Sequence, residues 1–311
     1  MKKELRSTRD AFGETLLNLG LQDNNIFALS ADLKDSLNLA EFAKKLPNQF
    51  IECGVAEQNM VGIATGLAIT AKIPFACSFS VFSPGKTWDQ IRVGICLSNL
   101  NVKIIGGHGG LSNYKDGASH QAFEDIAITR VLPNLKVIVP CDYTQTVKVI
   151  NAVSKDLGAT YIRLSSEKTP SITTKYSKFE VGKGELLKKG NELIVISYGP
   201  IIQKILGAID KAGINATVIN MVTIKPLDTE IIENALKDTK HLITVEDHQI
   251  IGGLGSAVAE YLAENHKKVN FKRIGVKDTF GLSAKNINEL YTHFGFNEDS
   301  LAKQFIEFIN N

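Results

Sequence analysis

The feature that most constrains the fold of this chain is the alternation of short apolar runs with longer helical patterns. In the first half, apolar runs lie at 26–30, 74–78, 102–106, 136–140 and 160–164. Helical patterns lie at 8–20, 57–71, 86–99 and 143–153. Because the runs are apolar almost throughout, we expect strands of a parallel sheet that helices cover on both faces. The pattern predicts an α/β fold of the doubly wound kind.

The alternation is interrupted once and then resumes, which indicates two domains. Residues 166–190 are largely polar and lack periodicity, as expected of a segment between domains. Further apolar runs follow at 192–197, 216–220 and 242–245, and a closing helix is expected near 298–310. We therefore predict a first domain at 1–170, a linker at 171–190 and a smaller α/β domain at 191–311.

The composition narrows the class of protein. The chain is 44% hydrophobic and 22% charged with a formal net charge of +2, and it has no basic block of the kind that binds nucleic acid. No apolar run reaches the roughly 18 residues that span a bilayer. The N-terminal residues lack the apolar core of a signal peptide, and the four cysteines form no Cys-x-x-Cys pair. We expect a cytoplasmic protein with reduced, mostly buried thiols and no metal site of its own.

A single carboxylate stands at the entrance of an unusually small-sided helix. Glu57 begins the pattern 57–71, in which Gly62, Ala64, Gly66 and other small residues leave room for another helix to pack closely. This placement suggests that the carboxylate acts on a group held between two packed surfaces.

Two further groups of residues follow predicted strands. Phe79 and Phe82 come at the end of the run 74–78, where they could form an aromatic wall. The run 102–106 leads into a glycine-rich loop that carries His108, Asp116 and His120. Parallel α/β sheets bind ligands at the carboxyl ends of their strands, and histidines can move protons near neutral pH. A loop whose polar residues only satisfy its own backbone is the alternative.

A glycine-rich turn late in the chain is less informative. Gly252-Gly-Leu-Gly255 follows a strand and opens a helix, which suits a dinucleotide site, but the full G-x-G-x-x-G spacing is absent. Glycines also allow a helix to start close to a sheet.

The order and spacing of these motifs resemble the C-terminal half of transketolase over nearly the whole chain. The motifs are Ser30-Ala-Asp32-Leu33, Gly54-Val-Ala-Glu57, Phe79-x-x-Phe82, the loop from His108 to His120, Val139-Pro-Cys-Asp142, Lys225-Pro-Leu-Asp228, and Thr244-Val-Glu246 with Gly252-Gly-Leu-Gly255. The resemblance implies a pyrimidine-binding domain of thiamine diphosphate enzymes followed by a transketolase-type C-terminal domain.

The resemblance also implies roles at the cofactor. Glu57 matches the residue that hydrogen-bonds N1′ of the aminopyrimidine and so helps the cofactor lose its thiazolium proton. Phe79 and Phe82 match the residues that hold the ring, and Asp32 matches a position near the cofactor. His108 and His120 match histidines around the reacting sugar.

At the substrate end the match is incomplete. Arg9, Ser36 and His108 match three residues that grip the sugar phosphate, and Asp116 matches the residue that reads a substrate hydroxyl. The fourth phosphate ligand of the family, an Arg, is replaced by Ser166, so either the phosphate is held differently or the sugar is unusual. Arg163 and Lys168 are possible substitutes. Gly85 also replaces a Tyr that many members carry.

The chain further lacks the Gly-Asp-Gly motif with which the family binds the diphosphate through Mg²⁺ (or Ca²⁺). The resemblance therefore implies one subunit of a split transketolase, inactive until a separate N-terminal subunit supplies that half. We expect a homodimer of this chain within a heterotetramer, acting on sugar phosphates of carbohydrate metabolism such as those of the pentose phosphate pathway.

Three alternatives stay open at this point. The β subunit of a 2-oxo acid dehydrogenase E1 shares the architecture and the activating Glu, and the C-terminal half of deoxyxylulose phosphate synthase is related. A subunit that serves only assembly or regulation is a different class, and it would need none of Glu57, the Phe pair and the histidine loop together.

Overall fold

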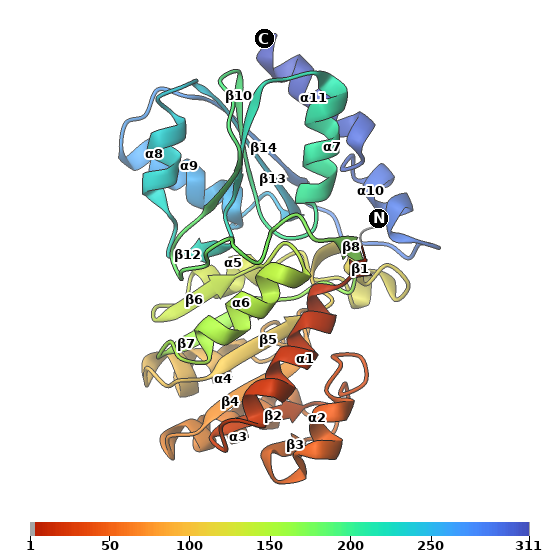
Figure 1. Ribbon diagram of the computed structural model, residues 1–311, viewed down its shortest axis with the longest axis vertical. Coiled ribbons are helices and arrows are strands. Elements are labelled where there is room, and N and C mark those ends of the chain that lie inside the picture. Colours follow the sequence, from red (N-terminus) through yellow and green to blue (C-terminus); the bar gives the residue numbers. More distant parts are fainter. Residues whose placement is uncertain (1–3, 311) are drawn as a thin grey trace.

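The computed structural model describes residues 4–310, which form two α/β domains stacked along the long axis (Figure 1). The first domain contains a seven-stranded sheet in which all strands but β12 run parallel. In spatial order its strands are β12 (Thr223–Lys225), β6 (Leu135–Ile138), β7 (Ala159–Arg163), β5 (Lys103–Gly107), β4 (Ile73–Phe79), β2 (Ile26–Ser30) and β3 (Phe50–Glu52).

Both faces of this sheet are buried, as the apolar runs predict. Neighbouring strand residues alternate between two cores: Leu29 and Ile104 pack on one side, and Ala28, Phe75 and Ile105 on the other. The helices of this domain are α1 (Thr8–Gly20), α2 (Ala40–Lys45), α3 (Glu57–Ile69), α4 (Trp88–Gln90) with its π-helical continuation Ile91–Leu97, α5 (Asp125–Arg130) and α6 (Tyr143–Val153). The doubly wound arrangement is therefore confirmed.

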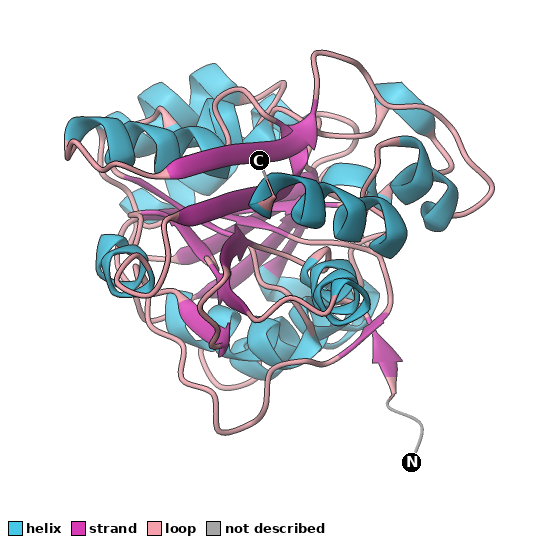
Figure 2. Ribbon diagram, turned by 90° about the horizontal axis from the view of Figure 1, so that it is seen from above, coloured by secondary structure: helices cyan, strands magenta, loops and turns pink. Residues whose placement is uncertain are grey.

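The second domain repeats the arrangement on a smaller scale, with helices on both faces of a five-stranded sheet (Figure 2). In spatial order its strands are β14 (Asn270–Val276), β13 (His241–Gln249), β10 (Leu193–Ser197), β11 (Ala216–Asn220) and β9 (Glu185–Lys188). Its helices are α7 (Ile202–Ala212), α8 (Thr229–Ala235), α9 (Leu254–Glu264), α10 (Ile287–His293) and α11 (Glu298–Ile309). Strand β9 lies inside the segment 171–190 that the sequence suggests as a linker.

Helix boundaries follow local signals. Helix α1 has the predicted bounds, and its start is fixed by a capping box: Ser7 Oγ accepts from Asp10 N at 3.1 Å, and Ser7 N donates to Asp10 Oδ2 at 2.9 Å. Asp142 caps α6 in the same way, accepting from Gln145 N at 2.8 Å. Strand β13 is longer than predicted, since it continues through polar residues to Gln249.

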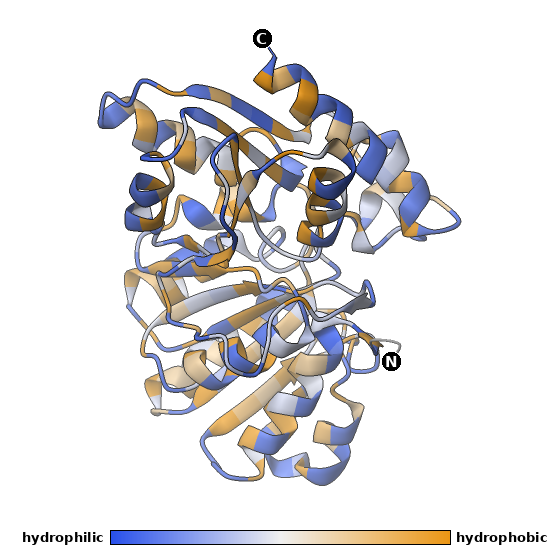
Figure 3. Ribbon diagram, turned by 45° about the horizontal axis from the view of Figure 1, so that its top comes forward, coloured by the Kyte–Doolittle hydropathy of each residue, from blue (hydrophilic) through white to orange (hydrophobic). Residues whose placement is uncertain are grey.

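The two domains are joined by a strand that crosses the boundary and by buried ion pairs. Strand β12 leaves the second half of the chain to pair with β6 of the first domain. A two-stranded sheet of β1 (Leu5–Arg6) and β8 (Thr169–Pro170) lies at the boundary (Figure 1). In each domain the inner strands are mostly hydrophobic, and the helices around them carry both hydrophobic and hydrophilic residues (Figure 3).

Arg163 is the buried charge at this boundary. Its Nε lies 3.0 Å from Asp125 Oδ2 in the first domain, and its Nη1 lies 2.7 Å from Asp247 Oδ1 in the second. Its side chain is only 4% exposed. The guanidinium therefore neutralises two carboxylates that would otherwise be left largely out of water.

We predict that Arg163→Met lowers the free energy of unfolding by about 3–5 kcal/mol, because it strands two carboxylates without their counter-charge. Denaturant unfolding followed by circular dichroism measures the loss. Arg130→Met is the matched control, because Arg130 also crosses the domain boundary but pairs with the half-exposed Glu260. Its expected loss is about 1 kcal/mol, and equal losses in the two variants would contradict the assignment.

Candidate functional site

The predicted site residues gather at the edge of the first sheet where the parallel strands end. Glu57 follows β3, the Phe pair closes β4, and His108 follows β5. The pairing of β4 with β5 places Phe79 opposite Gly107, so that Phe79 lies next to His108. Loops at this edge of a parallel sheet converge on a common ligand site.

Four aromatic rings form a continuous cluster at this edge. The ring centroids of Phe79 and Phe82 are 6.2 Å apart, with the planes inclined by 21°. His108 lies 4.4 Å from Phe79, and His120 lies 5.2 Å from Phe82 in an edge-on orientation. The structure therefore brings together the two Phe and two His residues that sequence reasoning selected. Such a wall can hold a flat ring by stacking and edge contacts.

Glu57 is the buried carboxylate of the site. It is the first residue of α3, and its side chain is 4% exposed. Its Oε2 accepts a hydrogen bond from Lys86 Nζ at 2.9 Å, and the Lys86 side chain is 48% exposed. A buried carboxylate is costly without a partner, so a lysine that can move into water is well suited to neutralise it reversibly. Sequence reasoning missed Lys86, since nothing local links it to Glu57.

The glycine at position 85 has a steric reason. A Cβ there would lie 2.0 Å from the carbonyl oxygen of Val81, so no side chain fits in this conformation. Lys86 directly follows Gly85 in the tight turn after Phe82, and its side chain reaches Glu57. The departure from the family pattern at Gly85 therefore accompanies the ion pair.

A second group surrounds Arg9 in the first turn of α1. Arg9 Nη1 donates to the carbonyl oxygen of Ser36 at 2.9 Å and lies 3.3 Å from His108 Nε2. The structure thus joins three of the residues predicted to grip a sugar phosphate. Ser36 contributes its backbone to this contact rather than its hydroxyl.

Two buried polar atoms of this group have no hydrogen-bond partner among residues 4–310: Arg9 Nε and His108 Nδ1. Buried polar atoms are nearly always satisfied, so such atoms mark a place where a ligand or water completes the bonding. His108 also has a backbone φ of 55°, a left-handed conformation that is rare for residues other than Gly and that concentrates at functional sites. Burial, with the neighbouring Arg9 cation, lowers the pKa of His108 to about 4.

The remaining predicted residues lie around this centre. Asp116 is exposed, and its negative charge raises the pKa of His108, whereas the Arg9 cation lowers it. His120 Nδ1 lies 2.9 Å from Ser119 Oγ. Asp32 is exposed with φ 60°, and its backbone N donates to Glu52 Oε1 at 2.7 Å. The bond between Asp32 and Glu52 thus comes from the Asp32 backbone rather than from its carboxylate.

Arg163 does not replace the missing phosphate ligand, so that suggestion from the sequence is wrong. Its guanidinium is enclosed inside the protein by the ion pairs to Asp125 and Asp247, and its Nη2 also donates to the carbonyl oxygen of Asp247 at 3.0 Å. Gly109 and Gly110 are glycines for this reason. A Cβ at Gly109 would lie 2.5 Å from Arg163 Cγ, and one at Gly110 would lie 1.9 Å from Asp247 Oδ2. The boundary charge thereby shapes the loop that follows His108.

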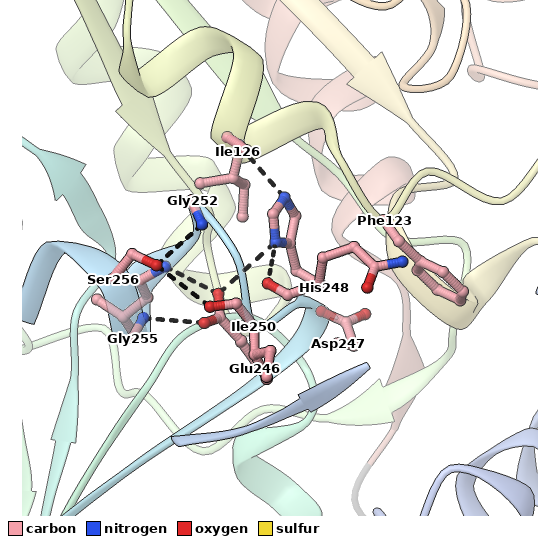
Figure 4. A network of polar contacts seen from close by, with 12 residues as sticks. Phe123, Ile126, Glu246, Asp247, His248, Ile250, Gly252, Gly255 and Ser256 are labelled. Carbon is pink, nitrogen blue, oxygen red and sulfur yellow. Dashed lines mark hydrogen bonds and ion pairs between the residues drawn. The ribbon is translucent and has the colours of Figure 1, made fainter. Parts of the chain in front are cut away.

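The glycine-rich turn at 252–255 is filled by the protein itself (Figure 4). The buried Glu246 carboxylate accepts from Leu254 N at 2.8 Å and Gly255 N at 2.9 Å, the amides that a dinucleotide phosphate would need. Burial raises the pKa of Glu246. His248 links this turn to the first domain, because its Nε2 accepts from Ala127 N at 3.3 Å. The dinucleotide hypothesis therefore fails, and the turn serves to anchor α9.

The structure bears on two other kinds of site. Within residues 4–310, no group of three or more His, Cys, Asp and Glu side chains is placed to hold a metal ion. No helix in the same part of the chain has the length and apolarity to traverse a bilayer. The four cysteines are free thiols, three of them buried.

Comparison with known proteins agrees with this arrangement. The sequence matches the family described as transketolase, pyrimidine binding domain, over residues 5–171, and that described as transketolase, C-terminal domain, over residues 182–301. The chain belongs to the transketolase family. The predicted resemblance and the fold class are thus confirmed.

Individual relatives match the chain from end to end. A putative transketolase C-terminal section from Methanocaldococcus jannaschii is 44% identical, over 97% of this chain and 96% of the relative. One subunit of an apulose-4-phosphate transketolase from Phocaeicola vulgatus is 36% identical over 99% of both. A solved structure described as a split gene transketolase, inactive β4 tetramer, is 38% identical with a TM-score of 0.88 and 98% coverage of both chains.

The low pKa of His108 predicts how the stability of this transketolase relative depends on pH. The imidazole stays neutral in the folded protein down to about pH 4, whereas in the unfolded chain it takes up a proton near pH 6.5. As the pH falls through this interval the unfolded state is favoured, by up to about 3 kcal/mol.

Denaturant unfolding at several pH values tests this, with His108→Gln as the reference because it lacks the titrating ring and keeps a polar side chain. We expect the wild type to lose more stability than His108→Gln between about pH 6.5 and 4. Identical slopes, or an NMR titration midpoint of His108 above pH 6, would contradict the result.

Proposed function

We propose that this chain is the C-terminal subunit of a two-chain transketolase. In this function it moves a two-carbon ketol unit from a ketose phosphate to an aldose phosphate, together with a separate N-terminal subunit. The observation that carries the proposal is the buried Glu57 carboxylate, which Lys86 links to the segment of the aromatic wall: Lys86 Nζ bonds Glu57, and Lys86 N donates to the carbonyl oxygen of Phe82 at 2.8 Å. The agreement of both domains with the transketolase family supports it.

The residues present fit the pyrimidine end of thiamine diphosphate. The ring cluster offers a flat apolar surface, and Glu57 offers one buried carboxylate whose Lys86 partner can withdraw into solvent. When bound, thiamine diphosphate supplies the electron sink that the breaking carbon–carbon bond of the sugar requires. We propose that Phe79 and Phe82 hold the aminopyrimidine and that Glu57 hydrogen-bonds its N1′ atom, with Asp32 nearby.

The surroundings of Glu57 suit a carboxyl group that shares a proton with a ligand. The side chain is nearly closed to water, so a proton shared with a ring nitrogen is not lost to solvent. In the structure Lys86 occupies Oε2 of Glu57, and its withdrawal into solvent would leave that buried oxygen free to share a proton. The carboxylate would therefore bond Lys86 in the absence of the cofactor and the aminopyrimidine nitrogen in its presence.

The group around Arg9 is proposed to hold the sugar. Arg9 Nε and His108 Nδ1 are the unpartnered atoms that can bond to substrate oxygens. A neutral His108 can donate from one ring nitrogen and accept at the other, which suits a hydroxyl or carbonyl group. His120 and Asp116 contribute further polar groups from the same loop, with His120 placed to move a proton to or from the sugar.

The dependence on a partner is proposed on three grounds. The sequence contains no Gly-Asp-Gly motif, and we propose that a second subunit holds the diphosphate through Mg²⁺ or Ca²⁺. The similar solved structure is described as an inactive β4 tetramer of a split gene transketolase. The outer face of α3 is open at Gly62 and Gly66, where a Cβ would meet nothing within 4 Å. A second copy of this chain can pack closely there, giving a homodimer within a heterotetramer.

We predict that Glu57→Gln lowers ketol transfer by the assembled complex by at least about 100-fold, because the amide keeps the shape and cannot share a proton. Lys86→Met is the companion variant, since it removes the ion pair and keeps the carboxylate. We expect Lys86→Met to keep activity within about tenfold of wild type.

Steady-state kinetics with thiamine diphosphate and Mg²⁺ present measures both variants, and far-ultraviolet circular dichroism confirms that each is folded. Full turnover by Glu57→Gln would remove Glu57 from the mechanism. A loss as large in Lys86→Met as in Glu57→Gln would show that the ion pair, rather than proton sharing, is what the reaction needs.

A further inference from the structure

A cleft of about 610 Å³ lies between the two domains, beside the proposed site. The first domain borders it with Ser112 and Tyr114 and with the segment 166–170. The second domain borders it with Gln203 and Lys204 in the first turn of α7. Neither Glu57 nor the ring cluster lines this cleft, so the chemistry described above does not account for it.

The walls of the cleft adjoin the residues that grip the sugar. Arg9 donates its backbone N–H to the carbonyl oxygen of Ser165 at 3.3 Å, and the next residue, Ser166, lines the cleft. Ser166 Oγ donates to the carbonyl oxygen of Ser112 at 2.8 Å, and Ser112 closes the turn that follows His108. The cleft therefore begins one residue away from the contacts of Arg9 and a single turn away from His108.

Two lysines give this cleft positive charge. Lys168 is exposed, and within residues 4–310 it has no carboxylate at ion-pair distance. Lys204 Nζ lies 3.4 Å from Asn288 Oδ1 and 5.5 Å from the ring centroid of Tyr291. Among the residues that the structure describes, neither ammonium is neutralised by a salt bridge, so both are available to an anion.

The carboxylates around the cleft do not cancel this charge. Burial raises the pKa of Glu167 to about 7, and its Oε2 accepts a hydrogen bond from the Tyr291 hydroxyl. At neutral pH this group is therefore only partly ionised. Glu298 lies 3.3 Å from Lys211 and is already paired. The Lys204 cation acts on Glu167 and lowers its pKa, so Glu167 is the carboxylate that faces Lys204, while Lys168 has no such neighbour among the described residues.

We propose that this cleft receives the anionic end of the sugar substrate, with Lys168 and Lys204 supplying the charge that an arginine at position 166 would otherwise bring. The assignment rests on the proposed function, because it names the sugar of that site as one that carries a phosphate or a similar tetrahedral oxyanion. Ser166 is small, so it leaves the passage toward the lysines open and offers a hydroxyl. Tyr114 and Gln203 add neutral hydrogen-bonding groups for the neighbouring sugar oxygens.

The geometry favours Lys168 and Lys204 over Arg163 as the cations that bind the anion. Arg163, the cation nearest to Ser166 in sequence on the preceding strand, is enclosed by Asp125 and Asp247 and cannot reach a ligand. Lys168 and Lys204 come from different domains, so an anion between them also bridges the domain boundary. Two ammonium groups bind an oxyanion as point charges, without the fixed fork of a guanidinium.

Binding of ribose 5-phosphate and of ribose is the test, measured by calorimetric titration on the full chain and on the assembled complex. The wild type is expected to bind ribose 5-phosphate more tightly than ribose. Lys168→Met and Lys204→Met should each weaken binding of ribose 5-phosphate by about tenfold, as for a lost charge-assisted bond, and leave binding of ribose unchanged. Lys175→Met is the matched control, because this exposed lysine follows the segment 166–170 in the sequence and does not line the cleft.

Steady-state kinetics of the complex supply the second readout. With a phosphorylated donor, the two lysine variants should raise KM by about tenfold with kcat altered less than twofold. A merely structural role would change the kinetics with a phosphorylated and an unphosphorylated donor alike. Equal binding of ribose 5-phosphate by the wild type and the two variants would overturn the assignment, as would a wild type that does not discriminate the two sugars. Phosphate-dependent binding by a complex that transfers no ketol unit would overturn the proposed function and leave the cleft assignment standing.

Discussion

A carboxylate kept out of water at the first turn of α3 is the constraint around which the site is arranged. Glu57 is buried where a charge is costly, and the cation that pairs with it is a lysine that is half in solvent. The tight turn at Gly85 brings that lysine within reach, and the Phe pair before it forms the adjacent wall. In the structure the buried carboxylate is thus paired with a cation that reaches it from the solvent side.

The second domain contributes to this site through buried charge. Arg163 joins carboxylates of both domains, and its bulk requires glycines immediately after His108. His108, which precedes these glycines, has a left-handed backbone, and burial together with the Arg9 cation lowers its pKa. The substrate contacts that we propose in the first domain therefore depend on how the second domain is docked, and the cleft that we assign to the anionic end of the sugar lies along the same boundary.

The sequence predicts well what local and periodic signals determine. Capping residues set the starts of α1 and α6, and apolar runs set the parallel strands, so the sequence alone places Phe79 and His108 at the carboxyl edge of the sheet. Contacts between distant segments were out of reach: the pairing of β12 with β6, the strand β9 within the expected linker, and the bond between Lys86 and Glu57. Arg163 was misjudged because its burial depends on Asp247, which lies 84 residues further along the chain.

The most direct test of the central claim, that this chain holds half of an active site, is cofactor binding and ketol transfer by the chain alone and with a Gly-Asp-Gly subunit added. Calorimetric titration with thiamine diphosphate and Mg²⁺, followed by a transfer assay on the same samples, gives both quantities. The account predicts that tight cofactor binding and turnover arise only in the mixture. Turnover by the purified chain alone would contradict it.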